Sequence, residues 1–439
     1  MLNTTETAHS TVPLRILVIG AGLAGLAAAL STKLANPSHD VTVLETVSEL
    51  AEVGAGLQIT PNASRLFTKW GIYDDLALKA TFPKTLSVWR YDGTKRLAHS
   101  PDFQERIGER YGAPFWGMHR VDLQRALCAR CDGLGVSIRL SSRVQSVDFE
   151  NTTITLEGGK TVDGDVILCT DGIYSATRSQ FLGIPCPPNP TGDLAYRIII
   201  DKSTLCGPDA EMLTAFIDSH SVNFWVGPDT HVVAYTMRGG DLFNIVLLCP
   251  DNLPPGLSRS TGDLDEMKRL FKGWDPILRA FLEQVKEVAK WRLLHLEPLE
   301  RWTSETGNFW MAGDACHPML PYLAQGANSS LEDGAVIGYL IGKVNVESKS
   351  AQLQKAARLY EELRKGRGEG IARETWGQRQ SFHMGDGEEQ VRRDEILLAG
   401  PQDAAGYPSR WQDFGGAQKW LYGYDAYVEA ARGFAKTPF

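Results

Sequence analysis

The stretch GAGLAG at Gly20–Gly25 decides how the N-terminal part of this chain folds. It follows the apolar run Arg15–Ile19, which has the composition of a buried parallel strand. Ala24–Leu34 is rich in Ala and Leu, as a helix would be, and Val41–Glu45 has the pattern of a second strand. The sequence therefore predicts one β-α-β unit with an acidic residue at the end of its second strand.

The three glycines of this stretch have the spacing of a dinucleotide-binding fingerprint. Gly20 permits a tight turn, Gly22 lets the backbone approach a pyrophosphate, and Gly25 allows the helix to pack closely. The N-terminus of the helix then offers free N–H groups and partial positive charge to the phosphates. Glu45 is placed where its carboxylate can accept hydrogen bonds from ribose hydroxyls. FAD and NAD share this fingerprint, so other stretches have to decide between them.

Two later stretches favour FAD. Residues 308–313 again have the texture of a parallel strand, and Asp314, which follows, can bind ribityl hydroxyls. The stretch Gln325–Asn328 begins a predicted helix whose N-terminal amides would face the pyrimidine edge of a flavin. This reasoning assigns to cofactor binding Gly313, Asp314, Gly326, Ala327 and Asn328.

The middle of the chain has a different texture, because strand-like runs follow one another with little helix between them. These runs are Ala195–Ile200, Val222–Val226, His231–Met237 and Asn244–Cys249. The fold class predicted is α/β, with a Rossmann-like FAD-binding domain, an inserted antiparallel-sheet substrate domain and a C-terminal helical segment. The predicted boundaries are 13–84, 113–185 and 291–378 for the discontinuous FAD-binding domain, 85–112 and 186–290 for the substrate domain, and 379–439 for the C-terminal segment.

Composition excludes several classes of function. The net charge of −8 argues against a nucleic-acid partner, and the absence of a long apolar run argues against a membrane span. Met1–Pro13 is polar and is expected to be a loose tail rather than a secretion signal. Seven cysteines, an odd number, favour reduced thiols and a cytoplasmic location. Cys128 and Cys131 lack a second pair, so we expect two thiols on a helix and no metal.

Taken together, the chain resembles the group A flavoprotein monooxygenases, specifically their salicylate hydroxylase-like branch in its fungal style. The resemblance extends from Arg15 to about Tyr424. The stretches that carry it, besides the glycine fingerprint, are Glu52–Asn62, His119–Leu123, Asp171-Gly172 with Arg178, and Gly313–Asp333.

The resemblance implies a place for several residues around FAD. Arg120 would reach the cofactor, Val144 would lie on its adenine side, and Pro321 would lie near the isoalloxazine ring. Asp314 would hold the ribityl-phosphate region, and Asp171 belongs to a motif associated with both FAD and nicotinamide cofactor. The alternatives are a surface helix charge for Arg120, a simple turn for Asp171 and a helix cap for Asp314.

The resemblance also implies a reaction. Using NADPH or NADH as a transient reductant and O2, the enzyme would hydroxylate a small aromatic, such as the phenolic acid salicylate, through a flavin C4a-hydroperoxide. Decarboxylation would accompany hydroxylation if the attacked carbon carries the carboxylate. The alternatives are oxidation of an indole alkaloid or polyketide phenol in biosynthesis, a flavin-dependent reductase or dehydrogenase without oxygen insertion, and a non-enzymatic sensor. A monomer or homodimer is expected.

Three residues are candidates for the chemistry. A phenol is mostly protonated at neutral pH, and a nearby cation favours its charged form. Related oxygenases place an arginine at the position of Arg197, and Tyr235 and His231 would share one face of a strand. The alternatives are a salt bridge at the domain joint for Arg197 and a structural role for His231.

The sequence departs from the family pattern at two positions. Ile198 follows the Tyr-Arg pair where glycine is common, which would reshape the pocket. Gln58 stands where some relatives have a histidine base, and glutamine cannot act as a base at neutral pH. His317, inside the Gly-Asp motif, is expected to be structural.

Overall fold

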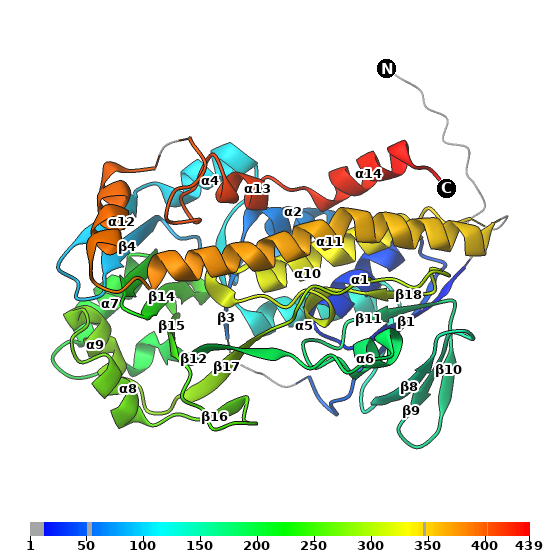
Figure 1. Cartoon of the computed structure of the whole chain (residues 1–439), viewed down its shortest axis with the longest axis horizontal. Coiled ribbons are helices and arrows are strands. Elements are labelled where there is room, and N and C mark those ends of the chain that lie inside the picture. The colour runs from blue at the N-terminus through cyan, green and yellow to red at the C-terminus, as the bar shows by residue number, and fades with distance from the viewer. Residues whose placement is uncertain (1–12, 51–54, 346–347, 402) are drawn as a thin grey trace.

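The structure, a computed structural model, describes residues 13–50, 55–345, 348–401 and 403–439, whose arrangement Figure 1 shows. The predicted tail up to residue 12 and Glu52–Gly54 of the family stretch lie outside the described residues.

A parallel sheet forms the centre of the N-terminal half, and its strands run in the order β18-β11-β1-β2-β7. Ile16 of β1 pairs with Val166 on one side and Val41 on the other. Both faces of the sheet are covered, so its central strands are almost continuously apolar. The predicted Rossmann-like core is therefore confirmed. The strands are β1 (Arg15–Ile19), β2 (Asp40–Leu44), β7 (Ser137–Arg139), β11 (Val166–Cys169) and β18 (Phe309–Met311).

Two helices, α1 (Leu23–Ala35) and α10 (Gln325–Ile341), pack against each other over this sheet. Their backbones approach very closely, because a Cβ added to Gly334 would lie 2.6 Å from the Ala27 backbone. The two glycine-containing stretches of the sequence, Gly20–Gly25 and Gln325–Asn328, therefore begin two neighbouring helices.

A larger sheet lies beside the parallel one, with strand order β16-β17-β12-β15-β14-β13-β4-β5. Its neighbouring strands are antiparallel, as predicted, except that β4 runs parallel to β13. No hairpin joins β4 to β13, so the turn that enforces antiparallel pairing is absent there. The strands are β4 (Thr85–Arg90), β5 (Arg96–Ser100), β12 (Asn189–Asp201), β13 (Ser221–Gly227), β14 (Thr230–Met237), β15 (Leu242–Pro250), β16 (Arg259–Thr261) and β17 (Ala289–His295).

Two small sheets and several shorter helices complete the fold. The small sheets comprise β3 (Gly56–Ile59) with β6 (Trp116–His119), and β8 (Val144–Asp148), β9 (Thr153–Leu156) and β10 (Thr161–Asp163). The shorter helices are α2 (Pro61–Trp70), α3 (Tyr73–Ala77), α4 (Phe103–Tyr111), α5 (Arg120–Gly133), α6 (Ala176–Leu182), α7 (Ala210–Asp218), α8 (Leu264–Leu270), α9 (Pro276–Glu283), α12 (Glu388–Ala399), α13 (Ala417–Tyr422) and α14 (Ala426–Lys436). Short 3-10 turns lie at Lys202–Thr204, Arg238–Gly240, Gly313–Ala315 and Pro321–Leu323.

The long helix α11 (Lys349–Phe382) connects the two large sheets and runs along most of the molecule in Figure 1. Near its start, the Tyr360 hydroxyl donates to the Met311 carbonyl of β18 at 2.8 Å. Near its end, Arg379 pairs with Asp193 of β12 at 2.7 Å. Of the helices in the described residues, none combines the length and apolar character that a membrane crossing requires.

Candidate functional site

A cavity lies between the larger sheet and the carboxyl end of the parallel sheet, where the turn after β11 and the starts of α1 and α10 line it. Its polar lining comes from the starts of α1 and α10, the start of α5, the turn after β11, and strands β3, β12, β14 and β15. Much of the remaining wall is apolar, including Phe224, Leu248 and Trp411. The residues predicted for the site that line it are Gly22, Arg120, Arg197, His231, Tyr235, Asp314, Pro321, Gly326 and Ala327.

The other predicted residues do not line the cavity. They are Gly20, Gly25, Glu45, Val144, Asp171, Gly313 and Asn328. Glu45 accepts hydrogen bonds from the backbone N–H groups of Ala21 at 2.7 Å and Val47 at 3.1 Å. Its carboxylate therefore fixes the glycine turn, and its contact with a ribose stays a prediction.

The start of α1 is open toward the cavity. No side chain caps this helix, and a Cβ added to its N-cap residue, Gly22, would meet no protein atom within 4 Å. The unsatisfied N–H groups of a helix N-terminus attract anions. This turn is therefore a cradle of the kind that a pyrophosphate fills.

The Gly-Asp turn brings a carboxylate to the cavity. The Gly313 N–H donates to Asp333 at 2.9 Å, and Asp314 then faces the cavity. Burial raises the pKa of Asp314, and the nearby charges of His317 and Arg120 offset part of this rise. His317 itself is buried and contacts Asp333 at 2.5 Å, the structural position expected for it.

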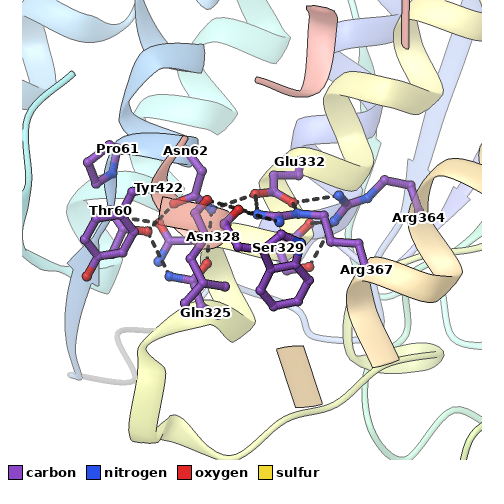
Figure 2. Close-up of polar contacts among 12 residues, drawn as sticks. Thr60, Pro61, Asn62, Gln325, Asn328, Ser329, Glu332, Arg364, Arg367 and Tyr422 are labelled. Carbon is purple, nitrogen blue, oxygen red and sulfur yellow. Dashed lines mark hydrogen bonds and ion pairs between the residues drawn. The ribbon is translucent and has the colours of Figure 1, made fainter. Parts of the chain in front are cut away.

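The start of α10 is tied to β3 by a buried set of amide hydrogen bonds (Figure 2). The Asn328 side chain accepts from the Thr60 N–H at 3.0 Å and donates to the Gln58 carbonyl at 2.9 Å. Gln325 donates to the Thr60 hydroxyl at 3.0 Å and accepts from Asn62 at 3.0 Å. Asn328 thus holds the wall of the cavity rather than facing into it.

An ion-pair cluster continues this network into α11 (Figure 2). Glu332 is fully buried and contacts Asn62 at 2.6 Å, Arg364 at 2.6 Å and Arg367 at 2.8 Å. Burial would raise the pKa of Glu332, but the two guanidinium charges and hydrogen bonds lower it. The carboxylate stays ionised, and it fixes α10 against α11.

The turn after β11 is joined to the Gly-Asp turn. Asp171 accepts from the Thr177 N–H at 3.4 Å, while Arg178, fully buried, donates to the Ala315 carbonyl at 2.9 Å. Thr170 and Gly172 line the cavity. Asp171 therefore sits as a turn residue would, and its contact with either cofactor stays a prediction.

On the side of the larger sheet, Arg197 faces the cavity together with Tyr235 and His231. The Arg197 guanidinium lies 5.1 Å from the ring centre of Trp291. Among the described residues no carboxylate lies within ion-pair distance of Arg197, so the salt bridge considered as its alternative role is not formed. Burial and the charge of Arg120 lower the pKa of Arg197, while Tyr235 raises it. A guanidinium nonetheless stays charged at neutral pH.

Sequence reasoning missed Asn244 and gave no ligand role to Gln58. The Asn244 side chain accepts from the Gly56 N–H at 3.1 Å, while its Nδ2 is buried without a protein partner. The Gln58 amide nitrogen is buried and unpaired in the same way, and both residues line the cavity. The available signal for Asn244 was a single polar residue in an apolar strand, directly opposite Tyr235.

The cavity fits FAD. It joins two helix starts without side-chain caps, those of α1 and α10, so a ligand with a pyrophosphate at one end and a flavin at the other can use both. Arg120 supplies a positive charge and Asp314 an acceptor for hydroxyls on the surface between these helix starts. The unpaired amide nitrogen of Gln58 lies on β3, which is bound to the start of α10.

Comparison with known proteins supports this fit. Residues 14–375 match the family model described as "FAD binding domain". The chain is 48% identical over 427 residues to "FAD-dependent monooxygenase OpS4" of Beauveria bassiana (strain ARSEF 2860), covering 97% of this chain and 98% of the relative. It is 30% identical to "3-hydroxybenzoate 6-hydroxylase" of Polaromonas naphthalenivorans (strain CJ2), with coverage of 94% and 96%.

A solved "Salicylate hydroxylase substrate complex" has the same fold, with a TM-score of 0.76, 22% identity and coverage of 96% of this chain and 98% of the other. The family match and the relatives agree with the geometry of the cavity. The chain therefore belongs to the FAD-binding-domain family and, within it, to the FAD-dependent monooxygenases of the aromatic hydroxylase type.

Proposed function

We propose that this monooxygenase uses NAD(P)H and O2 to hydroxylate a small aromatic acid, for which a phenolic acid such as salicylate is the simplest form. The observation that carries this proposal is Arg197, a cation that faces a largely apolar cavity without a protein carboxylate beside it. An apolar wall suits an aromatic ring, and a half-buried cation without an ion-pair partner among the described residues calls for an anion from the ligand.

The side chains around Arg197 would orient the ring and keep it ionised. Arg197 would stabilise a carboxylate or phenolate, and Asn244 would donate its unpaired N–H to a second acceptor. Burial raises the pKa of Tyr235 well above that of a free tyrosine, so its hydroxyl stays protonated and able to donate. Walls such as Phe224 and Trp411 would exclude water. Bound FAD supplies the oxygen activation, which no side chain of the protein provides.

The residues proposed to hold FAD divide between contact and support. Gly22, Arg120, Asp314, Pro321 and the start of α10 would touch it, whereas residues such as Gly20, Gly25 and Asn328 would hold these parts in place. We further propose a cytoplasmic location, because all seven cysteines are free thiols, and a monomer or homodimer as the assembly.

The test is turnover under 18O2. Purified protein should be yellow and should oxidise NADPH or NADH faster with salicylate, 3-hydroxybenzoate or another phenolic acid. The product should contain one atom of 18O by mass spectrometry. An unlabelled product would identify a reductase or dehydrogenase instead.

Two further outcomes would refine the substrate. Loss of CO2 together with gain of oxygen would indicate decarboxylative hydroxylation. Turnover only with indole alkaloids or polyketide phenols, and with no aromatic acid, would contradict the proposed substrate class. Protein that stays colourless when FAD is added would contradict the proposal as a whole.

A further inference from the structure

His231 and His383 form a buried pair beside the cavity. His231 Nδ1 lies 2.7 Å from His383 Nε2, and the ring centres are 4.9 Å apart. His231 comes from β14, and His383 follows the last residue of α11, at the end of this helix that reaches the larger sheet (Figure 1). Tyr322 and Phe382 pack edge-on against the His231 ring and hold its orientation.

The distance between these nitrogens requires one donor and one acceptor. Burial lowers the pKa of His231 well below its usual value, and it lowers the pKa of His383 to about 4. Both rings are therefore neutral at pH 7, and each carries one proton. Either His231 donates from Nδ1, or His383 donates from Nε2.

The surroundings of His383 distinguish these two arrangements. Its other nitrogen, Nδ1, is buried without a partner among the described residues. If His231 were the donor, the proton of His383 would have to be on this Nδ1, as an unpaired buried N–H. Unpaired buried N–H groups are rarer than unpaired acceptors, and leaving a donor unsatisfied costs about 1–3 kcal/mol.

If His383 is the donor, its Nδ1 is a bare acceptor, and the proton of His231 moves to Nε2. His231 lines the cavity, so this N–H can be satisfied there by water or a ligand. Asp193 and Arg379 also influence His383, but they pair with each other and their charges act on it in opposite directions. Hydrogen bonding, rather than charge, therefore selects the second arrangement.

We propose that His383 is a positioning residue that keeps the proton of His231 on Nε2, so that His231 donates a hydrogen bond to an acceptor oxygen of the aromatic substrate. This inference rests on the proposed hydroxylation and makes its substrate class narrower. The ring should carry an acceptor, a carboxylate, phenolate or carbonyl oxygen, that reaches His231. In this tautomer His231 cannot remove a proton from the substrate.

Nuclear magnetic resonance can read this tautomer directly. The FAD-loaded full chain is labelled with 15N-histidine, and long-range 1H–15N correlations distinguish protonated from bare ring nitrogens. Signals that disappear in His231→Phe identify His231. At pH 7 we expect a protonated Nε2 and a bare Nδ1 on His231. The opposite pattern would overturn the proposal.

Two substitutions of His383 test its role in positioning the proton of His231. His383→Gln keeps an N–H donor near the position of Nε2 and should preserve the His231 pattern. His383→Phe keeps an aromatic ring without the donor, and His231 should then lose its single tautomer. An unchanged pattern in His383→Phe would overturn the role of His383, and if this variant does not fold, loss of the pattern in His383→Gln would do so.

The tautomer of His231 is read by NMR and does not depend on whether the protein turns over a substrate. If the stated tautomer is found but no aromatic is hydroxylated, the proposed function is wrong and the assignment of the His231 proton to Nε2 is supported. If 18O enters an aromatic acid but His231 carries its proton on Nδ1, the proposed role of His383 is wrong and the proposed function is supported.

Discussion

Arg197 illustrates how surroundings, rather than residue type, define a functional side chain. Arg259 stacks on the same indole, with its guanidinium 4.8 Å from the ring centre of Trp291 against 5.1 Å for Arg197. Only Arg197 faces the cavity, whereas Arg259 is exposed on β16. The chain thus offers a matched pair of arginines that differ in their access to a ligand.

Replacing Arg197 should therefore affect catalysis far more than flavin binding. We expect Arg197→Ala to retain FAD and to lower coupled hydroxylation by about 10²-fold, because a preorganised charge is lost. The ratio of product to NAD(P)H consumed measures the coupling. Arg259→Ala is the control and should behave like the unmodified protein. Equal activity in both variants would remove Arg197 from the site.

Replacing Asp314 should weaken FAD binding and leave the substrate preference unchanged. Asp314→Ala removes the carboxylate at the cavity, and we expect FAD to be retained less tightly while the order of preference among aromatic acids is kept. Equilibrium dialysis of FAD measures the first effect, and relative kcat/KM values measure the second. Asp314→Asn keeps one acceptor oxygen, so its FAD affinity should lie between that of the unmodified protein and that of Asp314→Ala. FAD affinity that is the same in all three proteins would contradict this role.

At the level of helices, the start of α10 owes its position to charges buried beneath it. Glu332 on α10 pairs with two arginines from α11, and Asn62 connects the same carboxylate to α2 (Figure 2). One of these arginines, Arg364, also pairs with Asp333 of α10. Such a cluster contributes little net stability when it is complete, but removal of one partner leaves buried charge uncompensated. Its value here is to fix the helix whose N-terminus lines the cavity.

Glu332→Gln should consequently be strongly destabilising. We expect a loss of about 3–5 kcal/mol in the free energy of unfolding, because Arg367 loses its ion-pair partner and Arg364 is left with Asp333. Denaturant titration with a fluorescence readout measures it. Glu388→Gln removes an exposed carboxylate that pairs with Arg392 on α12 and should cost less than about 1 kcal/mol. Similar losses for the two variants would argue against the buried cluster.

The histidine at the end of α11 should give the protein an acid-sensitive stability. Burial lowers the pKa of His383 to about 4, so the folded chain keeps it neutral while the unfolded chain protonates it below about 6.5. This contribution is complete above pH 6.5 and is lost as the pH falls toward 4, at up to about 1.4 kcal/mol per pH unit.

Urea unfolding at several pH values between 7 and 4.5 tests this, with His383→Gln as the comparison. The variant should lose less stability on acidification than the unmodified protein. His39, with a pKa lowered to about 4, and His231, with a pKa lowered well below its usual value, are buried as well, so part of the slope should persist. Identical slopes would show that His383 is not buried as a neutral ring.

At the scale of the whole molecule, the two large sheets lie on either side of the cavity. The larger sheet contributes one wall of the cavity, and the turns and helix starts at the carboxyl end of the parallel sheet contribute another, while α11 contacts both sheets. A ligand that fills this space binds only the folded arrangement, so it stabilises the fold by mass action.

Removing FAD should therefore lower the Tm, and adding it back should restore the value. At a free concentration one hundred times the Kd, the expected stabilisation is about 2.7 kcal/mol. FMN lacks the AMP half, so it can use Asp314 and the start of α10 but brings one phosphate, rather than a pyrophosphate, to the turn at Gly22. We expect FMN to restore less of the Tm. Equal restoration by both would mean that the AMP half of FAD adds nothing to binding at the α1 turn.

Local sequence was sufficient for the cofactor-binding half. The run before Gly20, the glycine spacing and the texture around Asp314 each predict a short element, and the parallel sheet has all of them. Such signals are local because a buried parallel strand and a glycine turn depend mainly on their own residues. The four runs predicted in the middle of the chain lie in β12, β13, β14 and β15 of the larger sheet, whereas β4, β5, β16 and β17 and the parallel pairing of β4 with β13 were not predicted.

Contacts between distant residues were decided only by the tertiary structure. Nothing near Asn244 in the sequence shows that its side chain would accept a hydrogen bond from the Gly56 N–H. Nothing near His383 shows that its ring would contact His231. The pairing of side chains from separate elements is set by how sheets and helices pack, which no local pattern encodes. The sequence thus determined the cofactor and the class of chemistry, and tertiary packing decided which polar groups face the substrate.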